Sequence, residues 1–194
     1  SPYDETLEFF SIVVPDGAFT SNLQHLQVGD ELYLEKIPYG FLTLARYQLP
    51  LPQDLWLLAT GTGLAPFISM LQDFATWENY QQIYLVYSVR TASELAYVKR
   101  IEEIASSFGE GHNGFKFVPI ITRDPHAQLH DRLPILIENG ELEAAVGQQL
   151  NAASSHVMLC GNPQMVDDTR EALKRRGLTM NRRGEGNIAV ENYW

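Results

Sequence analysis

The segment from Asp54 to Leu71 (DLWLLATGTGLAPFISML) constrains the fold more than any other part of the chain. An apolar run ends in a glycine turn, and Pro66 then stands in the first turn of an expected helix. A strand, a glycine turn and a helix in this order direct backbone N–H groups and the positive end of the helix dipole at a ligand above the turn. Gly61 and Gly63 let the backbone approach such a ligand closely. The pattern predicts a phosphate or pyrophosphate site, and the alternative is a tight connection without a ligand.

Expected strands and helices alternate along the chain after residue 53. The strands are predicted at Leu55–Thr60, Gln82–Val89, Phe115–Ile121 and His156–Cys160. The helices are predicted at Leu64–Trp77, Ser93–Phe108, Leu133–Asn139 and Leu142–Val146, with a last one capped by Asn162, opened by Pro163 and closed by Gly177. This alternation predicts a doubly wound parallel sheet whose ligand lies above the carboxyl ends of the strands.

Residues 1–48 have a different pattern, which predicts β structure with turns. Strands are expected at Leu7–Val14, Glu31–Lys36 and Gly40–Leu44, and a short helix from Thr20 to Leu26. Two prolines in the stretch LPLPQ interrupt both helix and ladder, so we place a domain boundary between residues 48 and 49. Because a strand needs neighbours, we expect the first domain to be only part of a β domain, with its earlier strands absent from the chain.

Composition excludes several classes of protein. The net charge of −10 argues against nucleic acid as a partner, because such binding depends on Lys and Arg neutralising phosphates. The single cysteine excludes an intramolecular disulfide and suits a reducing compartment. We find neither a signal peptide nor an apolar run long enough to span a bilayer. We therefore expect a cytoplasmic monomer without membrane contact. His126 and His130 are four residues apart, but their polar, proline-containing surroundings predict a loop and no metal site.

Three arginines fall where the predicted sheet places its ligand. Arg90 directly follows one predicted strand, Arg123 closes the run FVPIITR two residues after another, and Arg132 lies on a nearby loop. In a dinucleotide fold, an arginine after the second strand accommodates the 2′-phosphate of NADP, whereas an acidic residue there would bind a ribose hydroxyl. Bidentate guanidinium groups suit a dianionic phosphate. The alternative is that each arginine is solvated or pairs with a nearby carboxylate, namely Asp124, Asp131 or Glu94.

Several motifs together resemble those of the bacterial ferredoxin/flavodoxin–NADP reductases. They are LLATGTGLAPFISML, YSVR followed by SELAYVKRIEEI, ITRD followed by DRLP, HVMLCGNPQMV and an aromatic C-terminus. The resemblance implies an antiparallel FAD-binding barrel followed by an NADP-binding α/β domain. It also implies hydride transfer between NADPH and FAD, with single electrons passed to ferredoxin or flavodoxin. The family's flavin-ring motif, R-x-Y-S/T, is not found in the chain, which agrees with a partial barrel of residues 1–48.

The resemblance also implies a role for particular residues. For FAD these are Phe10, Ser11, Ile12 and Val13 along the flavin, Ala18, Phe19 and Thr20 at its pyrophosphate, Thr62 between flavin and nicotinamide, and the stacking pair Tyr193 and Trp194. For NADP these are Arg90, Arg123 and Arg132 at the 2′-phosphate, and Gly161, Asn162, Pro163 and Asp168 beside the nicotinamide, with Gly61 and Gly63 in the glycine turn. Glu191 and Cys160 are the candidates for tuning hydride transfer.

Purely structural interpretations of these residues remain open. Glu191 would otherwise be a surface carboxylate, Cys160 a small buried strand residue, and the terminal aromatics the seal of a core edge. A basic cluster of Lys174, Arg175, Arg176, Arg182 and Arg183 either ends a solvated helix or docks an acidic electron carrier. At the level of function, the alternatives are a related NAD(P)H flavin reductase with another acceptor and a flavin-free NADP-binding module.

Overall fold

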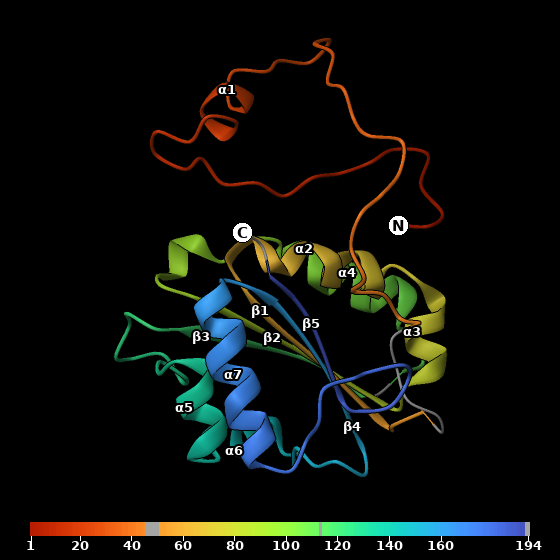
Figure 1. Cartoon of the computed structure of the whole chain (residues 1–194), viewed down its shortest axis with the longest axis vertical. Helices are drawn as coiled ribbons and strands as arrows, with labels where there is room; N and C mark the ends of the chain where they lie inside the picture. The colour runs from red at the N-terminus through yellow and green to blue at the C-terminus, as the bar shows by residue number, and fades with distance from the viewer. Residues whose placement is uncertain (46–50, 113, 193–194) are drawn as a thin grey trace.

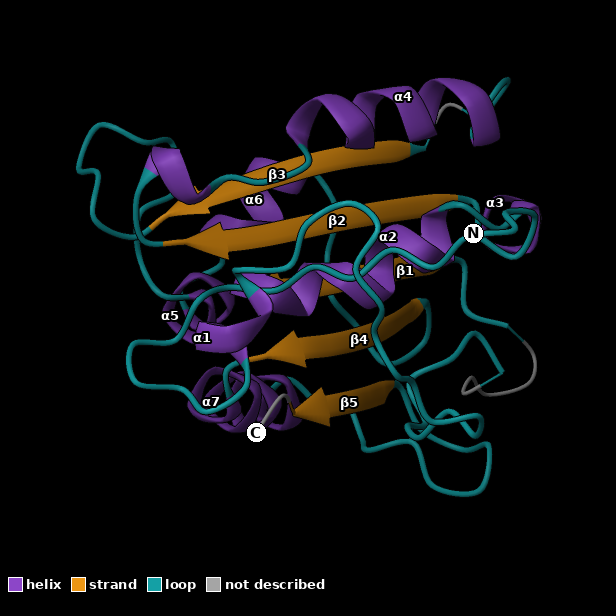
Figure 2. Ribbon diagram, turned by 90° about the horizontal axis from the view of Figure 1, so that it is seen from above, coloured by secondary structure: helices purple, strands orange, loops and turns teal. Residues whose placement is uncertain are grey.

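A five-stranded parallel sheet forms the centre of the molecule in the computed structural model, which describes residues 1–45, 51–112 and 114–192. The strands are β1 (Asp54–Thr60), β2 (Gln82–Val89), β3 (Phe115–Ile121), β4 (Ser155–Gly161) and β5 (Ile188–Asn192). Their order is β3-β2-β1-β4-β5, and all the arrows point the same way (Figure 2). The order reverses between β1 and β4, which is the switch point where such sheets bind ligands.

Helices cover both faces of the sheet. The helical elements after β1 are the 3₁₀ turns η1 (Gly61–Leu64) and η2 (Ala92–Glu94) and the helices α2 (Ala65–Leu71), α3 (Phe74–Asn79), α4 (Val98–Phe108), α5 (Leu133–Glu138), α6 (Glu141–Val146) and α7 (Pro163–Arg175). Helices α2 and α4 lie on one face, and α5, α6 and α7 lie on the other (Figure 1). The prediction of a doubly wound α/β fold is therefore confirmed for this part of the chain.

Strand β1 is buried on both faces, as its continuous apolar sequence predicts. Leu55 and Leu57 point into the core beneath α2 and α4, whereas Trp56 and Leu58 point into the core beneath α5 and α7. Each of the four predicted strands is observed within one residue of its expected bounds. The short edge strand β5 was not predicted from the sequence.

The prediction of one continuous helix over Leu64–Trp77 is wrong, because the helix is interrupted at Asp73. That residue has an extended backbone, and its carboxylate accepts the N–H of Ala75 at 3.0 Å. Asp73 thus caps a new helix, α3, in the way that short acidic side chains favour.

The predicted helix Ser93–Phe108 is also interrupted. A capping box of Thr91 and Glu94 is present, but it closes only the single turn η2. Tyr97 then adopts a left-handed backbone with φ 62°, and α4 begins at Val98. A positive φ is uncommon for a residue other than glycine, so no helix pattern could indicate it.

The expected strands in residues 1–45 are not observed. This segment has turns, irregular backbone and one short helix, α1 (Thr20–Leu23), and none of its described residues belongs to a strand. A strand exists only where a neighbour pairs with its backbone, and the apolar pattern alone does not supply one. The segment runs above the layer of α2 and α4 (Figure 1). The predicted boundary at residues 48 and 49 lies outside the described residues.

Most side chains of this segment face solvent, but a few attach it to the α/β body. Leu42 is buried in the core beneath α2. The ring of Phe10 packs edge-on against that of Tyr97 with centroids 5.2 Å apart. The Tyr97 hydroxyl donates a hydrogen bond to the Glu8 carboxylate. Among the described residues, all the exposed large hydrophobic side chains except Phe74 and Ile135 lie between Tyr3 and Phe41.

None of the helices in the described part of the chain is both long and apolar enough to cross a lipid bilayer.

The contact between Tyr97 and Glu8 predicts an unusual tyrosine titration. The hydrogen bond to Glu8 favours the neutral phenol and raises the pKa of Tyr97 to about 12. Because the folded-state pKa lies above the unfolded value of about 10, this contact stabilises the fold below that pH, and its contribution is lost as the pH rises through 12. Glu8→Gln should move one tyrosine titration, followed by NMR, back towards 10. Glu5→Gln, which changes an exposed neighbour, is the control, and unchanged titrations in Glu8→Gln would contradict the contact.

Candidate functional site

Two neighbouring hollows lie where the strands end. The first, here called the Arg132 hollow, has a volume of about 410 Å³ and includes Ser88, Thr122 and Arg132 in its lining. The second, here called the Thr62 hollow, has a volume of about 260 Å³ and includes Phe10, Thr62 and Tyr87. Four residues line both hollows, namely Thr60, Val89, Arg90 and Asn162. The site therefore occupies the carboxyl edge of β1, β2 and β4, as the sheet order predicts.

The hydroxyl of Thr60 joins the two turns that flank the switch point. Its oxygen accepts the backbone N–H of Asn162 at 3.1 Å, so the end of β1 is bonded to the turn after β4. Gly63 packs against the Cys160 carbonyl so closely that an added methyl group would overlap it. Gly61, in contrast, has φ 53° and open space on its side-chain side. Position 63 is thus glycine in part because it packs closely against the end of β4. Space for a ligand remains above Gly61.

Asn162 occupies the N-terminus of α7. Its side-chain oxygen accepts the N–H groups of Gln164 at 3.0 Å and Met165 at 3.3 Å, which confirms the predicted cap. These N–H groups are therefore not free for an anion. The Asp168 carboxylate accepts a hydrogen bond from Gln164 at 2.8 Å and lines the Arg132 hollow.

The three predicted arginines differ in their partners. Arg90 forms an ion pair with Glu94, with 2.7 Å between Nη2 and Oε1. Arg123 and Arg132 are exposed, and neither forms an ion pair with any residue that the structure describes. The backbone N–H of Arg123 donates to the Arg90 carbonyl at 2.9 Å, so the two loops are joined. Pairing with Glu94 is thus observed for one arginine, and two guanidinium groups remain available.

The residues predicted to hold a flavin are only partly brought together. Phe10 and Ile12 line the Thr62 hollow, whereas Ser11 and Val13 do not. Ala18, Phe19 and Thr20 lie at the start of α1, and the Thr20 hydroxyl accepts the N–H of Val14 at 3.0 Å. Tyr193 and Trp194 lie outside the described residues.

Cys160 and Glu191 are register partners on β4 and β5, but neither lines the Arg132 hollow or the Thr62 hollow. Cys160 is fully buried in the core beneath α2. The Glu191 carboxylate accepts the backbone N–H groups of Phe41 at 3.3 Å and Leu42 at 3.1 Å. In this structure Glu191 therefore binds the first segment of the chain to the sheet, and its predicted part in hydride transfer stays a prediction.

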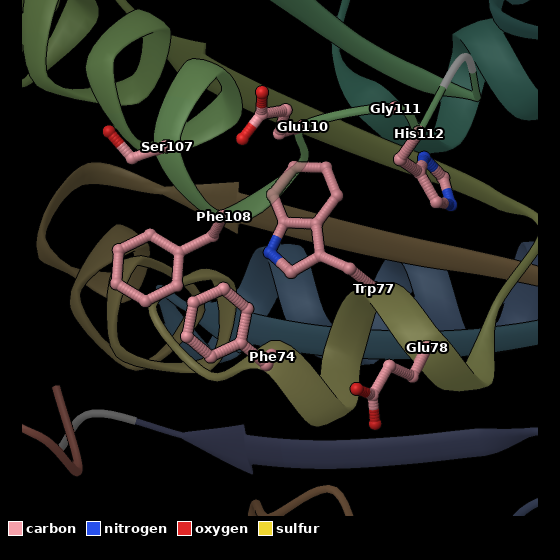
Figure 3. A pocket seen from close by; sticks show the side chains of 8 residues that line it. All are labelled: Phe74, Trp77, Glu78, Ser107, Phe108, Glu110, Gly111 and His112. Atoms are coloured by element: carbon pink, nitrogen blue, oxygen red, sulfur yellow. The ribbon is translucent and has the colours of Figure 1, made fainter.

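A larger hollow, of about 530 Å³, lies at the opposite edge of the sheet between α3 and the end of α4 (Figure 3). Its wall includes Phe74, Trp77, Phe108 and His112. The indole N–H of Trp77 donates to the Leu71 carbonyl at 2.9 Å. Both His112 ring nitrogens are hydrogen-bonded, one to the Tyr80 carbonyl and one to the N–H of Gly114. The polar groups of Trp77 and His112 therefore serve the fold, and volume alone does not identify the functional site.

Sequence reasoning found the arginines but missed the residues that hold them in place. The Thr60 hydroxyl, which joins the two turns, carries no motif of its own. Glu94 was considered as a neutralising partner of Arg90, and its spacing of four residues from Arg90 and its capping box were visible signals of a fixed position. Gln164 and Met165, which line the Arg132 hollow, were expected only as parts of a helix.

Comparisons with known proteins agree with this geometry. Residues 57–171 match the model of the oxidoreductase NAD-binding domain family. The ferredoxin–NADP reductase of Pseudomonas aeruginosa is 40% identical over 196 residues, which cover 97% of this chain and 75% of that protein. The flavodoxin/ferredoxin–NADP reductase of Escherichia coli is 39% identical, over 100% of this chain and 77% of that protein.

A solved structure supports the same relationship. The ferredoxin–NADP reductase of Neisseria gonorrhoeae, crystallised with FAD and NADP, superposes with a TM-score of 0.83 and 34% identity, over 92% of this chain and 71% of that one. The fold and the site thus define a nucleotide-binding domain of an oxidoreductase. The chain belongs to the ferredoxin/flavodoxin–NADP reductase family.

The junction at the switch point predicts unequal effects of two glycine substitutions. Gly63→Ala should lower the free energy of unfolding by about 3 kcal/mol or more, because its methyl group overlaps the backbone of β4. Gly61→Ala should cost only about 1 kcal/mol, the strain of a positive φ in open space. Urea unfolding of both variants measures the difference, and equal losses would contradict the packing argument.

Proposed function

We propose that this chain is a ferredoxin/flavodoxin–NADP reductase that transfers hydride between NADPH and FAD and exchanges single electrons with ferredoxin or flavodoxin. The observation that carries the proposal is a pair of guanidinium groups that form no ion pair with any described residue of this acidic protein. Arg132 lines the hollow at the carboxyl edge of the sheet, and Arg123 lies on the loop after β3 that is bonded to Arg90. The names of its relatives and the bound FAD and NADP of the related structure support the same activity.

The donor set of the Arg132 hollow fits a dinucleotide with a 2′-phosphate. Arg132 would bind the phosphate from the α5 side, and Arg123 would approach it from the adjoining loop, since charge-assisted hydrogen bonds from guanidinium suit phosphate oxygens. The hydroxyls of Ser88 and Thr122 line the same hollow and would bind ribose. Asn162 and Pro163 would then form the wall beside the nicotinamide, with Asp168 nearby.

The Thr62 hollow fits the flavin side of the reaction. Phe10, Ile12 and Tyr87 supply apolar walls, and Thr62 supplies a hydroxyl beside the glycine turn. When bound, FAD supplies the ring that accepts hydride and releases the electrons singly. The work of this chain is to hold the two rings together across Thr60 and Asn162, which line both hollows, and to exclude water with Phe10 and Ile12.

The basic cluster near the C-terminus does not form an obvious binding site for the electron carrier. Lys174, Arg175 and Arg176 form ion pairs with Glu171, Glu138 and Glu143. Arg182 and Arg183 lie in the turn before β5, at the amino edge of the sheet and thus opposite the two hollows. We therefore assign the carrier no place in this cluster. Action as a monomer in the cytoplasm stays a prediction.

The arginine assignment predicts a change in cofactor preference. Arg123→Ala and Arg132→Ala should each weaken NADPH binding about 10- to 100-fold, the worth of a charge-assisted hydrogen bond, and NADH binding by less than about threefold. Calorimetric titration with both coenzymes measures this difference. Arg182→Ala at the opposite edge is the matched control. Equal losses for NADPH and NADH would reject the 2′-phosphate site and favour the related flavin reductase.

Flavin binding separates the reductase from a flavin-free nucleotide-binding module. We expect the chain to bind added FAD, with a shifted visible spectrum and quenched flavin fluorescence, because apolar walls in the Thr62 hollow shield the ring from water. Phe10→Ala should weaken this binding, and Phe9→Ala, which removes the exposed neighbouring ring outside the hollow, is the comparison. Binding of NADPH with no spectral change on addition of FAD would favour the module for this chain.

A further inference from the structure

The side chain of Glu94 is committed to holding Arg90. One carboxylate oxygen accepts hydrogen bonds from Arg90 Nε at 3.0 Å and from Nη2 at 2.7 Å. The other oxygen accepts the backbone N–H of Arg90 at 2.8 Å and that of Thr91 at 3.3 Å. A single carboxylate thus fixes both the guanidinium group and the backbone from which it extends.

The position of Arg90 gives this arrangement a functional meaning. Arg90 lines both hollows, whereas Glu94 lines only the Thr62 hollow. Arg90 therefore stands in the wall between the two hollows, with Glu94 on the side of the Thr62 hollow. Its third nitrogen, Nη1, forms no hydrogen bond within the described part of the chain and is available to a ligand.

A free arginine in this wall would have to be ordered whenever a ligand bound. Arginine has one of the largest losses of side-chain rotamer freedom among the amino acids, and a ligand that immobilises it bears that cost. Glu94 has already ordered the side chain in the absence of ligand. Arg90 also differs electrostatically from Arg123 and Arg132, because the Glu94 carboxylate already neutralises its charge in the absence of a phosphate.

We propose that Glu94 is a positioning residue for the pyridine dinucleotide, holding Arg90 in the wall between the two hollows so that Nη1 meets the bound molecule already oriented. This inference rests on the proposed function, because it takes NADPH as the occupant of the Arg132 hollow. Hydrogen bonding to Arg90 lowers the pKa of Glu94, so the carboxylate stays charged at neutral pH.

Glu94→Gln tests the proposal with little disturbance of the backbone. An amide oxygen can still accept the N–H groups of Arg90 and Thr91, since glutamine also serves in capping boxes. The charge that holds the guanidinium is removed. We expect NADPH to bind about three- to tenfold more weakly, the cost of immobilising one long side chain on binding.

A double-mutant cycle distinguishes positioning from direct contact. Calorimetry with NADPH, and with 2′,5′-ADP as a probe lacking the nicotinamide, would compare the unaltered chain, Glu94→Gln, Arg90→Ala and the double variant. We expect Glu94→Gln to weaken binding only where Arg90 is present, and to change the dissociation constant less than about twofold in the Arg90→Ala background. Glu103→Gln is the matched control, because Glu103 pairs with Arg100 at 3.4 Å on the exposed side of α4.

Each other outcome would overturn the inference. Equal weakening in both backgrounds would show that Glu94 acts directly or through the fold, and urea unfolding of the variants would tell these two apart. Tighter NADPH binding by Glu94→Gln would show that Glu94 competes with the ligand for Arg90. Unchanged NADPH binding by Glu94→Gln would show that Arg90 does not need Glu94 to hold it in position. Failure of the unaltered chain to bind NADPH at all would overturn the proposed function as well, which the other outcomes leave standing.

Discussion

The contact between the ends of β1 and β4 is the constraint on which the rest of the site depends. Gly63 packs directly on the Cys160 carbonyl, and the Thr60 hydroxyl accepts the N–H of Asn162 at 3.1 Å. These contacts set the separation of the two turns that carry the glycine segment and the start of α7. Because Thr60 and Asn162 line both hollows, the packing of the strand ends also fixes the shape of the site.

Charge is distributed unevenly in a protein whose overall balance is strongly negative. The net charge of −10 would repel a dinucleotide at long range, so recognition has to come from a few local cations. Arg123 and Arg132 are unpaired with respect to the described residues, whereas Arg90 is bound to Glu94. The carboxyl edge of the sheet thus carries two guanidinium groups without an ion-pair partner among the described residues and one, Arg90, that is paired and oriented. The first two can attract a phosphate, and the third can orient the bound molecule.

The sequence was sufficient for the parts of the fold that depend on local pattern. Buried strands such as β1 and capped helices such as α7 carry their signals within a few residues, and both were predicted closely. Asp73 was a visible cap that a longer apolar pattern obscured, and the left-handed Tyr97 is stabilised by contacts with Glu8 and Phe10, far away in the sequence. The predicted strands of residues 1–45 failed for a similar reason, since pairing is a property of neighbours.

In the candidate site too, features set by neighbouring residues in the sequence were predicted, and features set by distant residues were not. Arginines at strand ends were found because strand ends are local, but which of them is free depends on partners that only the folded chain reveals. The shared wall of the two hollows has one further consequence. Thr60, Val89, Arg90 and Asn162 belong to both, so whatever fills one hollow touches the boundary of the other. If a ligand in one hollow displaces these shared residues, it would change the affinity of the other hollow, and the second ligand would change the affinity of the first by the same factor.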